Sequence, residues 1–240
     1  MTTLLVIAKE PLPGRVKTRL TPPFTPEEAA SLAEAALADT LAAAARVPAG
    51  RHVLVLDGAP GPWLPAGFDV VPQAAGGLDE RLAAAFSACA GPALLIGMDT
   101  PQVTPGLLAP ALVWDAHDAW LGPAADGGFW ALGLARPDPA LLLGVPMSRA
   151  DTGAVQYQRL RAAGLSVGLL PVLRDVDTAA DARQVAADAP GTRFAARLAA
   201  PAGPIARAAP ITGAGPITGA GPITGAGPIT GAGPIAGSGR

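Results

Sequence analysis

One stretch near the start of the chain decides its fold: Ala8-Lys9-Glu10-Pro11-Leu12-Pro13-Gly14-Arg15-Val16-Lys17-Thr18-Arg19-Leu20. The apolar run Leu4 to Ile7 directly precedes it and predicts a buried first strand, because it is short, branched and abruptly ended by charge. The prolines and the glycine of the stretch exclude a helix and force a shaped loop. A loop at the carboxyl end of a buried strand is where open α/β sheets bind their ligands.

Four cations are crowded into this loop, which are Lys9, Arg15, Lys17 and Arg19. Lys9 and Lys17 are the only lysines in the chain, so we interpret them as part of a site that neutralises a diphosphate or triphosphate. A solvated turn is the competing interpretation, because charge runs are usually exposed. A P-loop is excluded, because that motif needs a glycine immediately before the lysine and Val16 stands there.

Composition divides the chain of 240 residues into two parts. From about residue 201 the sequence becomes a repeat of Gly-Pro-Ile-Thr-Gly-Ala, in which each unit carries one bulky apolar residue and no charge. Such a segment cannot bury enough apolar surface to offset its ordering entropy, so residues 201–240 are predicted to be a disordered tail. Residues 1–200 are enough for one domain with a sizeable core.

Charge and cysteine content exclude several classes of protein. The formal net charge of −2 gives no indication of a nucleic-acid partner or an anionic membrane surface. A single cysteine, Cys89, excludes an internal disulfide and is compatible with a reducing compartment. Because no apolar run approaches the length of a membrane span, we expect a cytoplasmic protein, with the oligomeric state left open.

The pattern along residues 1–200 alternates short apolar runs with longer helical segments. Thr25, Pro26 and Glu28 form a capping-box helix start. Strands are predicted over 4–7, 53–56, 68–71, 93–96, 119–122, 129–134 and 167–170, and helices over 26–47, 78–90, 105–114, 152–163 and a final 179–187. This alternation predicts an α/β fold with three layers, α/β/α, and a mainly parallel sheet.

Carboxylates follow two of these strands. Asp99 lies in Gly97-Met98-Asp99-Thr100-Pro101, directly after a buried strand and at the same sheet edge as the basic loop. We predict that it binds Mg²⁺ or Mn²⁺, which take one or two protein carboxylates and complete their shell with phosphate oxygens and water; a simple loop cap is the alternative. Asp175 and Asp177 point to the same side of an extended segment, so one can be a second ligand. We assign that role to Asp177, which could equally cap the following helix.

Two further motifs supply candidate residues. Asp126 lies in a glycine-rich turn before Phe129 and Trp130, where it could serve an acceptor as base or polar anchor, or simply form a hairpin turn. Asp79 and Arg81 begin the helix after Gly77 and could bind a base or ribose, although carboxylates at helix starts are common for dipole reasons alone.

These motifs together resemble the GT-A-fold nucleotide-diphospho-sugar transferases, and most closely the bacterial rSAM/selenodomain-associated transferase family. The resemblance runs from about residue 3 to 190 and includes relatives of the MobA, CofC and IspD type. Two positions depart from the family pattern: Phe129 replaces a tyrosine, and Pro146-Met147-Ser148-Arg149 lacks a tryptophan before the serine. The resemblance implies a nucleotide-binding loop and a metal ligand, Asp99. The predicted nucleotide-binding residues are Ala8, Lys9, Gly14, Arg15, Lys17, Asp79 and Arg81.

The predicted function is therefore a metal-dependent transferase that moves a glycosyl group from a nucleotide-sugar to a small acceptor, with Lys17 and Asp126 as its catalytic residues. Nucleotidyl transfer from a nucleoside triphosphate, with release of pyrophosphate, is the alternative, since four cations suit a triphosphate. A non-catalytic nucleotide-binding or scaffolding protein is a further alternative.

Overall fold

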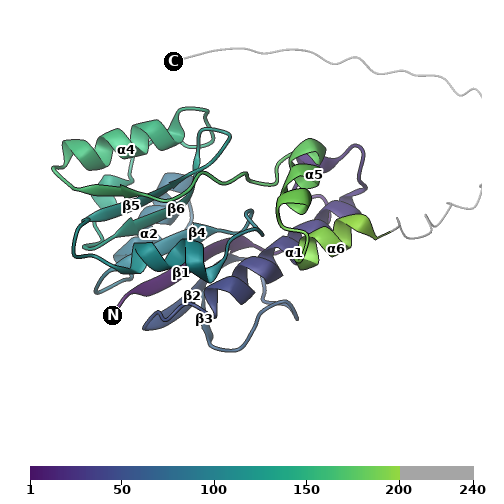
Figure 1. Cartoon of the computed structure of the whole chain (residues 1–240), viewed down its shortest axis with the longest axis horizontal. Helices are drawn as coiled ribbons and strands as arrows, with labels where there is room; N and C mark the ends of the chain where they lie inside the picture. Colours follow the sequence, from purple (N-terminus) through teal and green to yellow (C-terminus); the bar gives the residue numbers. More distant parts are fainter. Residues whose placement is uncertain (201–240) are drawn as a thin grey trace, which may run out of the picture. The chain divides into compact units, whose positions relative to one another are not determined.

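The structure of the chain, a computed structural model, describes residues 1–200 (Figure 1). The predicted repeat tail, 201–240, lies outside the described residues, and the proposal of a disordered tail stays a prediction.

A single sheet of seven strands forms the centre of the domain, in the order β3-β2-β1-β4-β6-β5-β7. β6 runs antiparallel to β4 and β5, and the other neighbouring strands pair in parallel. The predicted α/β fold with a mainly parallel sheet is confirmed. The strands are β1 (Thr3–Lys9), β2 (Arg51–Asp57), β3 (Phe68–Pro72), β4 (Ala93–Gly97), β5 (Ala119–Pro123), β6 (Phe129–Leu134) and β7 (Val167–Leu169).

Helices cover both faces of this sheet (Figure 1). Thr25 caps the first helix with the predicted capping box, in which its side chain accepts from the Glu28 N–H. The α-helices are α1 (Pro26–Ala44), α2 (Leu78–Ser87), α3 (Pro105–Leu108), α4 (Thr152–Ala162), α5 (Ala179–Asp188) and α6 (Arg193–Ala199). Short 3-10 turns are η1 (Thr18–Leu20), η2 (Ala109–Leu112) and η3 (Pro139–Leu141).

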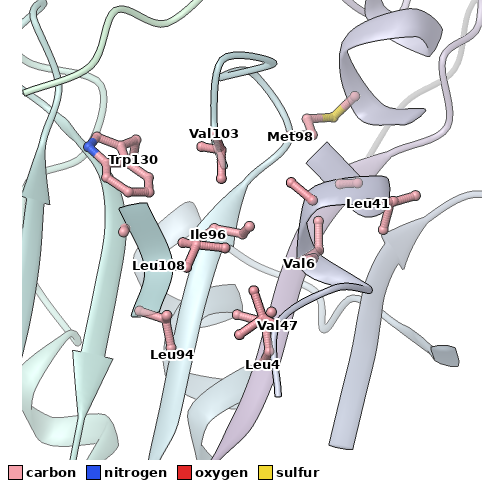
Figure 2. Packing of buried hydrophobic residues seen from close by; sticks show 14 of the residues in the cluster. Leu4, Val6, Leu41, Val47, Leu94, Ile96, Met98, Val103, Leu108 and Trp130 are labelled. Carbon is pink, nitrogen blue, oxygen red and sulfur yellow. The ribbon is translucent and has the colours of Figure 1, made fainter. Parts of the chain in front are cut away.

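The alternation of side chains along the strands divides the core into two layers. Leu4 and Val6 of β1 point to the face covered by α1 and α3, where they pack with Leu41, Ile96 and Leu108 (Figure 2). Leu5 points to the opposite face, covered by α2 and α4, and belongs to a cluster with Phe86 and Leu160. Successive strand residues face opposite sides, so one short apolar run serves both layers.

Two predicted elements need correction. The helix expected over 105–114 ends as an α-helix at Leu108 and continues as the 3-10 turn η2, because Pro110 has no N–H to donate. The helix beginning after Thr178 is not the last one, since α6 follows it. α6 packs on α1 and α5 through Phe194, which is fully buried against Leu32 and Val185.

The N-terminus of α5 is held by a second capping box. The Thr178 side chain accepts from the Asp181 N–H, and the Asp181 carboxylate accepts from the Thr178 N–H. None of the helices in the described part of the chain combines the length and the apolar character that a membrane span requires.

We expect Thr178→Ala to lower the free energy of unfolding by about 1 kcal/mol, because it leaves a backbone donor of the first turn without its side-chain acceptor. Urea unfolding measures the loss. Thr178→Ser is the matched control, since it keeps the hydroxyl; equal losses in both variants would contradict the role of the cap.

Candidate functional site

A cavity of about 400 Å³ opens at the sheet edge where β1 and β4 end and β6 begins. Parallel strands bring their carboxyl ends to one edge, and the antiparallel β6 brings its first residues to the same edge. Six of the predicted site residues line this cavity: Ala8, Lys9, Arg81, Asp99, Asp126 and Asp177.

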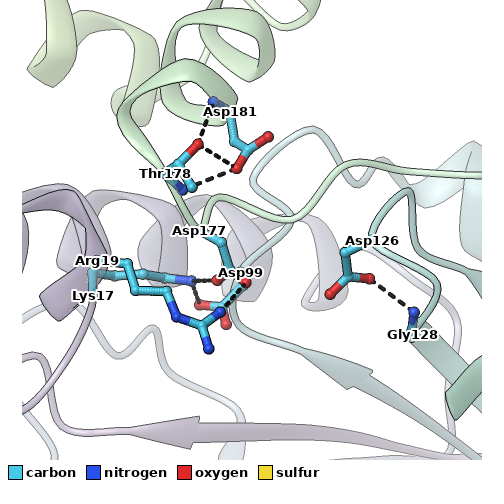
Figure 3. A network of polar contacts seen from close by, with 8 residues as sticks. All are labelled: Lys17, Arg19, Asp99, Asp126, Gly128, Asp177, Thr178 and Asp181. Atoms are coloured by element: carbon cyan, nitrogen blue, oxygen red, sulfur yellow. Dashed lines mark hydrogen bonds and ion pairs between the residues drawn. The ribbon is translucent and has the colours of Figure 1, made fainter. Parts of the chain in front are cut away.

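Lys17 lies at the centre of a polar network beside this cavity (Figure 3). Its Nζ lies 2.8 Å from Oδ1 of Asp99 and 3.3 Å from Oδ1 of Asp177, and its side chain is 8% exposed. Burial by itself lowers the pKa of Lys17, but the two carboxylates outweigh it and raise that pKa above its ordinary value. Lys17 is therefore a buried, charged ammonium that holds two cavity carboxylates together.

The two carboxylates come from different segments that the backbone joins. Asp99 follows β4, and Asp177 precedes α5. The Val176 N–H donates to the Asp99 carbonyl at 3.0 Å, which fixes the two segments side by side. Arg19 adds a longer ion pair to Asp177, at 3.5 Å. The predicted proximity of the basic loop and Asp99 is thus a direct contact in the structure.

The oxygens around Lys17 suit a hard divalent cation. Asp99 and Asp177 already converge on one positive centre, and their side chains are 38% and 36% exposed, so they remain accessible from the cavity. Within residues 1–200 no three His, Cys, Asp or Glu side chains gather closely enough to hold a metal by themselves. Mg²⁺ is commonly bound by one or two protein carboxylates, with phosphate oxygens and water completing its shell.

Asp175 adds a third carboxylate that lines the same cavity. Burial, followed by the charges of Asp99 and Asp126, raises the pKa of Asp175 to about 7. The sequence pattern already paired Asp175 with Asp177 as a possible second metal ligand, and that role was assigned to Asp177. The cavity thus concentrates negative charge that a bound cation would neutralise.

The raised pKa of Asp175 predicts a pH-dependent stability. The folded protein holds this proton more tightly than the unfolded chain, so stability falls as the pH rises from about 4 through about 7. We expect Asp175→Asn to raise the free energy of unfolding by about 2 kcal/mol at pH 8, after allowance for partial exposure, with a gain that shrinks toward pH 4. Urea midpoints at several pH values measure this.

Asp115→Asn is the matched control, because Asp115 is exposed and makes no hydrogen bond or ion pair to a described residue. A gain for Asp175→Asn that is the same at pH 8 and pH 4.5 would contradict the assignment.

Asp126 lies in the hairpin turn between β5 and β6 and also lines the cavity. Its Oδ1 accepts from the Gly128 N–H at 2.8 Å, which is a local turn contact (Figure 3). Gly127 has a φ of 90° and passes so close to the Ala150 carbonyl that a side chain would clash with it. The other carboxylate oxygen of Asp126 makes no hydrogen bond to a described residue, and the backbone of the turn packs on the loop before α4.

Arg81 lines the cavity from α2 and is held by a residue the sequence did not single out. Its Nη1 donates to Gln73 Oε1 at 3.0 Å, and Gln73 Nε2 donates to the Ala8 carbonyl at 2.6 Å. Gln73 follows β3 directly, and a polar residue at a strand end was the available signal.

Asp79, by contrast, does not line the cavity: it accepts from the Gly144 N–H at 2.9 Å, which lowers the pKa of Asp79.

Gly14 and Arg15 are exposed in the loop after β1 and do not line the cavity. Gly14 adopts a φ of 73°, which lets the loop turn toward Lys17. Their predicted contacts with a nucleotide remain predictions.

Half of the chain matches a known protein family. Residues 30–149, half of the chain, match the family described as "Uncharacterized protein conserved in bacteria (DUF2064)". The chain belongs to this family. The matched residues of the family domain include Arg81, Asp99 and Asp126, whereas Lys9, Lys17 and Asp177 lie outside the matched range.

Solved structures share the fold. A protein assigned provisionally as a nucleotide-diphospho-sugar transferase, from Desulfovibrio desulfuricans G20, is 29% identical with a TM-score of 0.67, over 74% of this chain and 82% of that one. A nucleotidyl transferase from Methanothermobacter thermautotroptrophicus is 15% identical with a TM-score of 0.50, over 77% and 95%.

CMP:2-keto-3-deoxy-manno-octonic acid synthetase in complex with CTP is 13% identical with a TM-score of 0.50, over 78% of this chain and 97% of that one. These last two likenesses establish the fold alone. A search of curated proteins finds no match. The predicted GT-A-like fold of this DUF2064 member is confirmed, and its membership of the rSAM-associated family stays a prediction.

Proposed function

We propose that this protein is a divalent-metal-dependent transferase that uses a nucleotide-sugar and transfers its glycosyl group to a small acceptor. One observation carries the proposal: Asp99 and Asp177 converge on the Lys17 ammonium at the edge of a cavity that Lys9 also lines. Carboxylates and lysines at one sheet edge are the groups that hold a metal-bound diphosphate.

The donor side of the cavity is assigned to β1, β4 and α2. Lys9 would neutralise the diphosphate, Lys17 would keep Asp99 and Asp177 together, and these two carboxylates would hold Mg²⁺ or Mn²⁺. The metal, when bound, supplies positive charge where negative charge develops on the departing nucleoside diphosphate. Arg81, oriented by Gln73, would contact the base or ribose.

The acceptor side is assigned to Asp126. Its carboxylate would accept the proton of an acceptor hydroxyl as the oxygen of that hydroxyl forms the new glycosidic bond. The bond between the sugar and the diphosphate breaks at the same centre, and the nucleoside diphosphate leaves with the bonding electrons.

The distribution of cations favours a diphosphate donor over a triphosphate. Of the four cations in the loop after β1, Lys9 lines the cavity, Lys17 and Arg19 pair with carboxylates, and Arg15 is exposed outside the cavity lining. The 29% identical structural relative, assigned as a nucleotide-diphospho-sugar transferase, supports the same choice. Nucleotidyl transfer is the second candidate, favoured by the total of four cations in the loop.

The test is a binding panel on the full chain. Thermal unfolding is followed with nucleoside triphosphates, nucleoside diphosphates and nucleotide-sugars, each with Mg²⁺ or with a chelator. A ligand at about a hundred times its dissociation constant adds about 2.7 kcal/mol of stability, which such a panel detects readily.

Metal-dependent stabilisation by one nucleotide-sugar is the expected result, and it would identify the donor. Stabilisation by a triphosphate alone, with pyrophosphate released on addition of phosphorylated acceptors, would replace glycosyl transfer by nucleotidyl transfer. Absence of stabilisation by every compound would reject the enzymatic proposal in favour of a non-catalytic scaffold.

A further inference from the structure

The loop between η3 and α4 brings a further cation, Arg149, to the cavity. Met147, Ser148 and Arg149 line the cavity from this loop, and Thr152 lines it from the first position of α4. None of the contacts described for the donor involves this loop, so its role is open.

A two-point contact with Asp151 orients the Arg149 guanidinium, whose side chain is 61% exposed. Its Nε and Nη2 each donate to the Asp151 carboxylate at 2.9 Å, forming a two-point ion pair. Its Nη1 makes no hydrogen bond to any residue in the described part of the chain. A guanidinium anchored on one edge in this way presents its remaining N–H groups to a ligand with little further loss of rotamer freedom.

The backbone under Arg149 is fixed as well. The Thr152 hydroxyl donates to the Pro146 carbonyl at 2.8 Å and accepts from the Arg149 N–H at 3.1 Å. The Gly153 N–H donates to the Gly127 carbonyl at 2.8 Å, which docks the loop on the turn that carries Asp126. A side chain at Gly153 would clash with the Gly128 carbonyl, so this docking depends on glycine.

Arg149 and Asp126 therefore share one wall of the cavity through two packed turns. An anionic group bound by Arg149 would place the rest of a small acceptor beside Asp126. Ser148, with a left-handed φ of 58°, adds a hydroxyl to the same lining.

We infer that Arg149 binds an oxyanion of the acceptor, so that the acceptor is a small hydroxylated molecule carrying a phosphate or a carboxylate. This inference rests on the proposed function for the identity of the second substrate. Guanidinium groups recognise both oxyanions by paired N–H···O bonds.

The test uses the full chain and compares a substitution on the acceptor side of the cavity, Arg149→Gln, with one on the donor side, Lys9→Gln. Glycerol 3-phosphate, glycerate and glycerol serve as phosphate, carboxylate and neutral probes of similar size, and their binding is measured by calorimetry or by NMR titration. Arg149→Gln should weaken binding of the preferred charged probe at least about tenfold, because it removes a charge-assisted contact. Lys9→Gln should leave that affinity nearly unchanged, while weakening a Mg²⁺-nucleotide.

Arg136→Gln is the matched control, because Arg136 is exposed, lies outside the cavity and has no hydrogen bond to a described residue. The charged probe that binds more tightly identifies the oxyanion. If Arg149→Gln instead weakens the nucleotide and spares both charged probes, or if neither charged probe binds better than glycerol, the inference is wrong. Failure of the proposed function would look different, since Mg²⁺-nucleotide binding would then be absent from the wild-type chain.

Discussion

Replacing Asp99 by asparagine is expected to abolish the stabilisation that a nucleotide ligand gives in the presence of Mg²⁺. The substitution preserves shape but removes one of two carboxylates that converge on a single positive centre, the Lys17 ammonium. A hard divalent cation held by two protein carboxylates cannot lose one without a large loss of affinity. Turnover, once a substrate pair is known, should fall by about 100-fold or more, the order seen when a charge-stabilising group is removed from an active site.

The measurement is the shift in unfolding temperature with nucleotide, in Mg²⁺ and in chelator, for wild type and Asp99→Asn. Asp115→Asn provides the control, as an exposed aspartate outside the cavity. Asp99→Glu, which keeps the charge, tests whether the carboxylate itself is required. An unchanged metal-dependent shift in Asp99→Asn would remove this residue from the metal site.

The second large effect is expected at Lys17. Replacing Lys17 by methionine removes a buried cation and leaves Asp99 and Asp177 facing each other, with Asp175 nearby. Removal of one partner from a buried ion pair lowers the free energy of unfolding by about 3–5 kcal/mol in general. Because the carboxylate side chains here are more than one-third exposed, we expect a smaller loss of about 2–3 kcal/mol.

The pH range of this loss follows from the raised pKa of Lys17. A lysine whose pKa is raised in the folded state contributes its stability fully below the unfolded value and loses it only as the pH rises through the folded value. The ammonium is therefore charged throughout pH 6 to 9, and its own titration adds no pH dependence to the loss there.

The effect of Mg²⁺ on the stability of Lys17→Met distinguishes the loss of a charge from a packing defect. A divalent cation would take over the neutralisation of the two carboxylates, so Mg²⁺ should stabilise Lys17→Met more than wild type in the absence of nucleotide. Arg46→Met is the control, because Arg46 is an exposed cation that does not line the cavity. Equal losses in both variants, with no extra response to Mg²⁺, would show that Lys17 has no special role.

The local rules of the sequence were sufficient for most of the fold. Short apolar runs ended by glycine, proline or charge marked each of the seven strands, and the capping box at Thr25 marked the start of α1. Strand alternation and capping involve residues within a few positions of one another, so they can be predicted without the tertiary structure. α6 was not predicted, because it is a seven-residue helix whose stability comes from burying Phe194 against distant helices.

Some features of the candidate site likewise follow from the sequence, and others depend on the tertiary structure. The sequence by itself determined which residue types lie at the ends of the strands: Lys9 after β1, Asp99 after β4 and Asp126 before β6. The tertiary structure alone decided that Lys17 bridges Asp99 and Asp177, the latter 160 positions away, that Gln73 orients Arg81, and that Arg149 enters the cavity. Ion pairs and cavity walls depend on how distant segments cross in space, which no local pattern encodes.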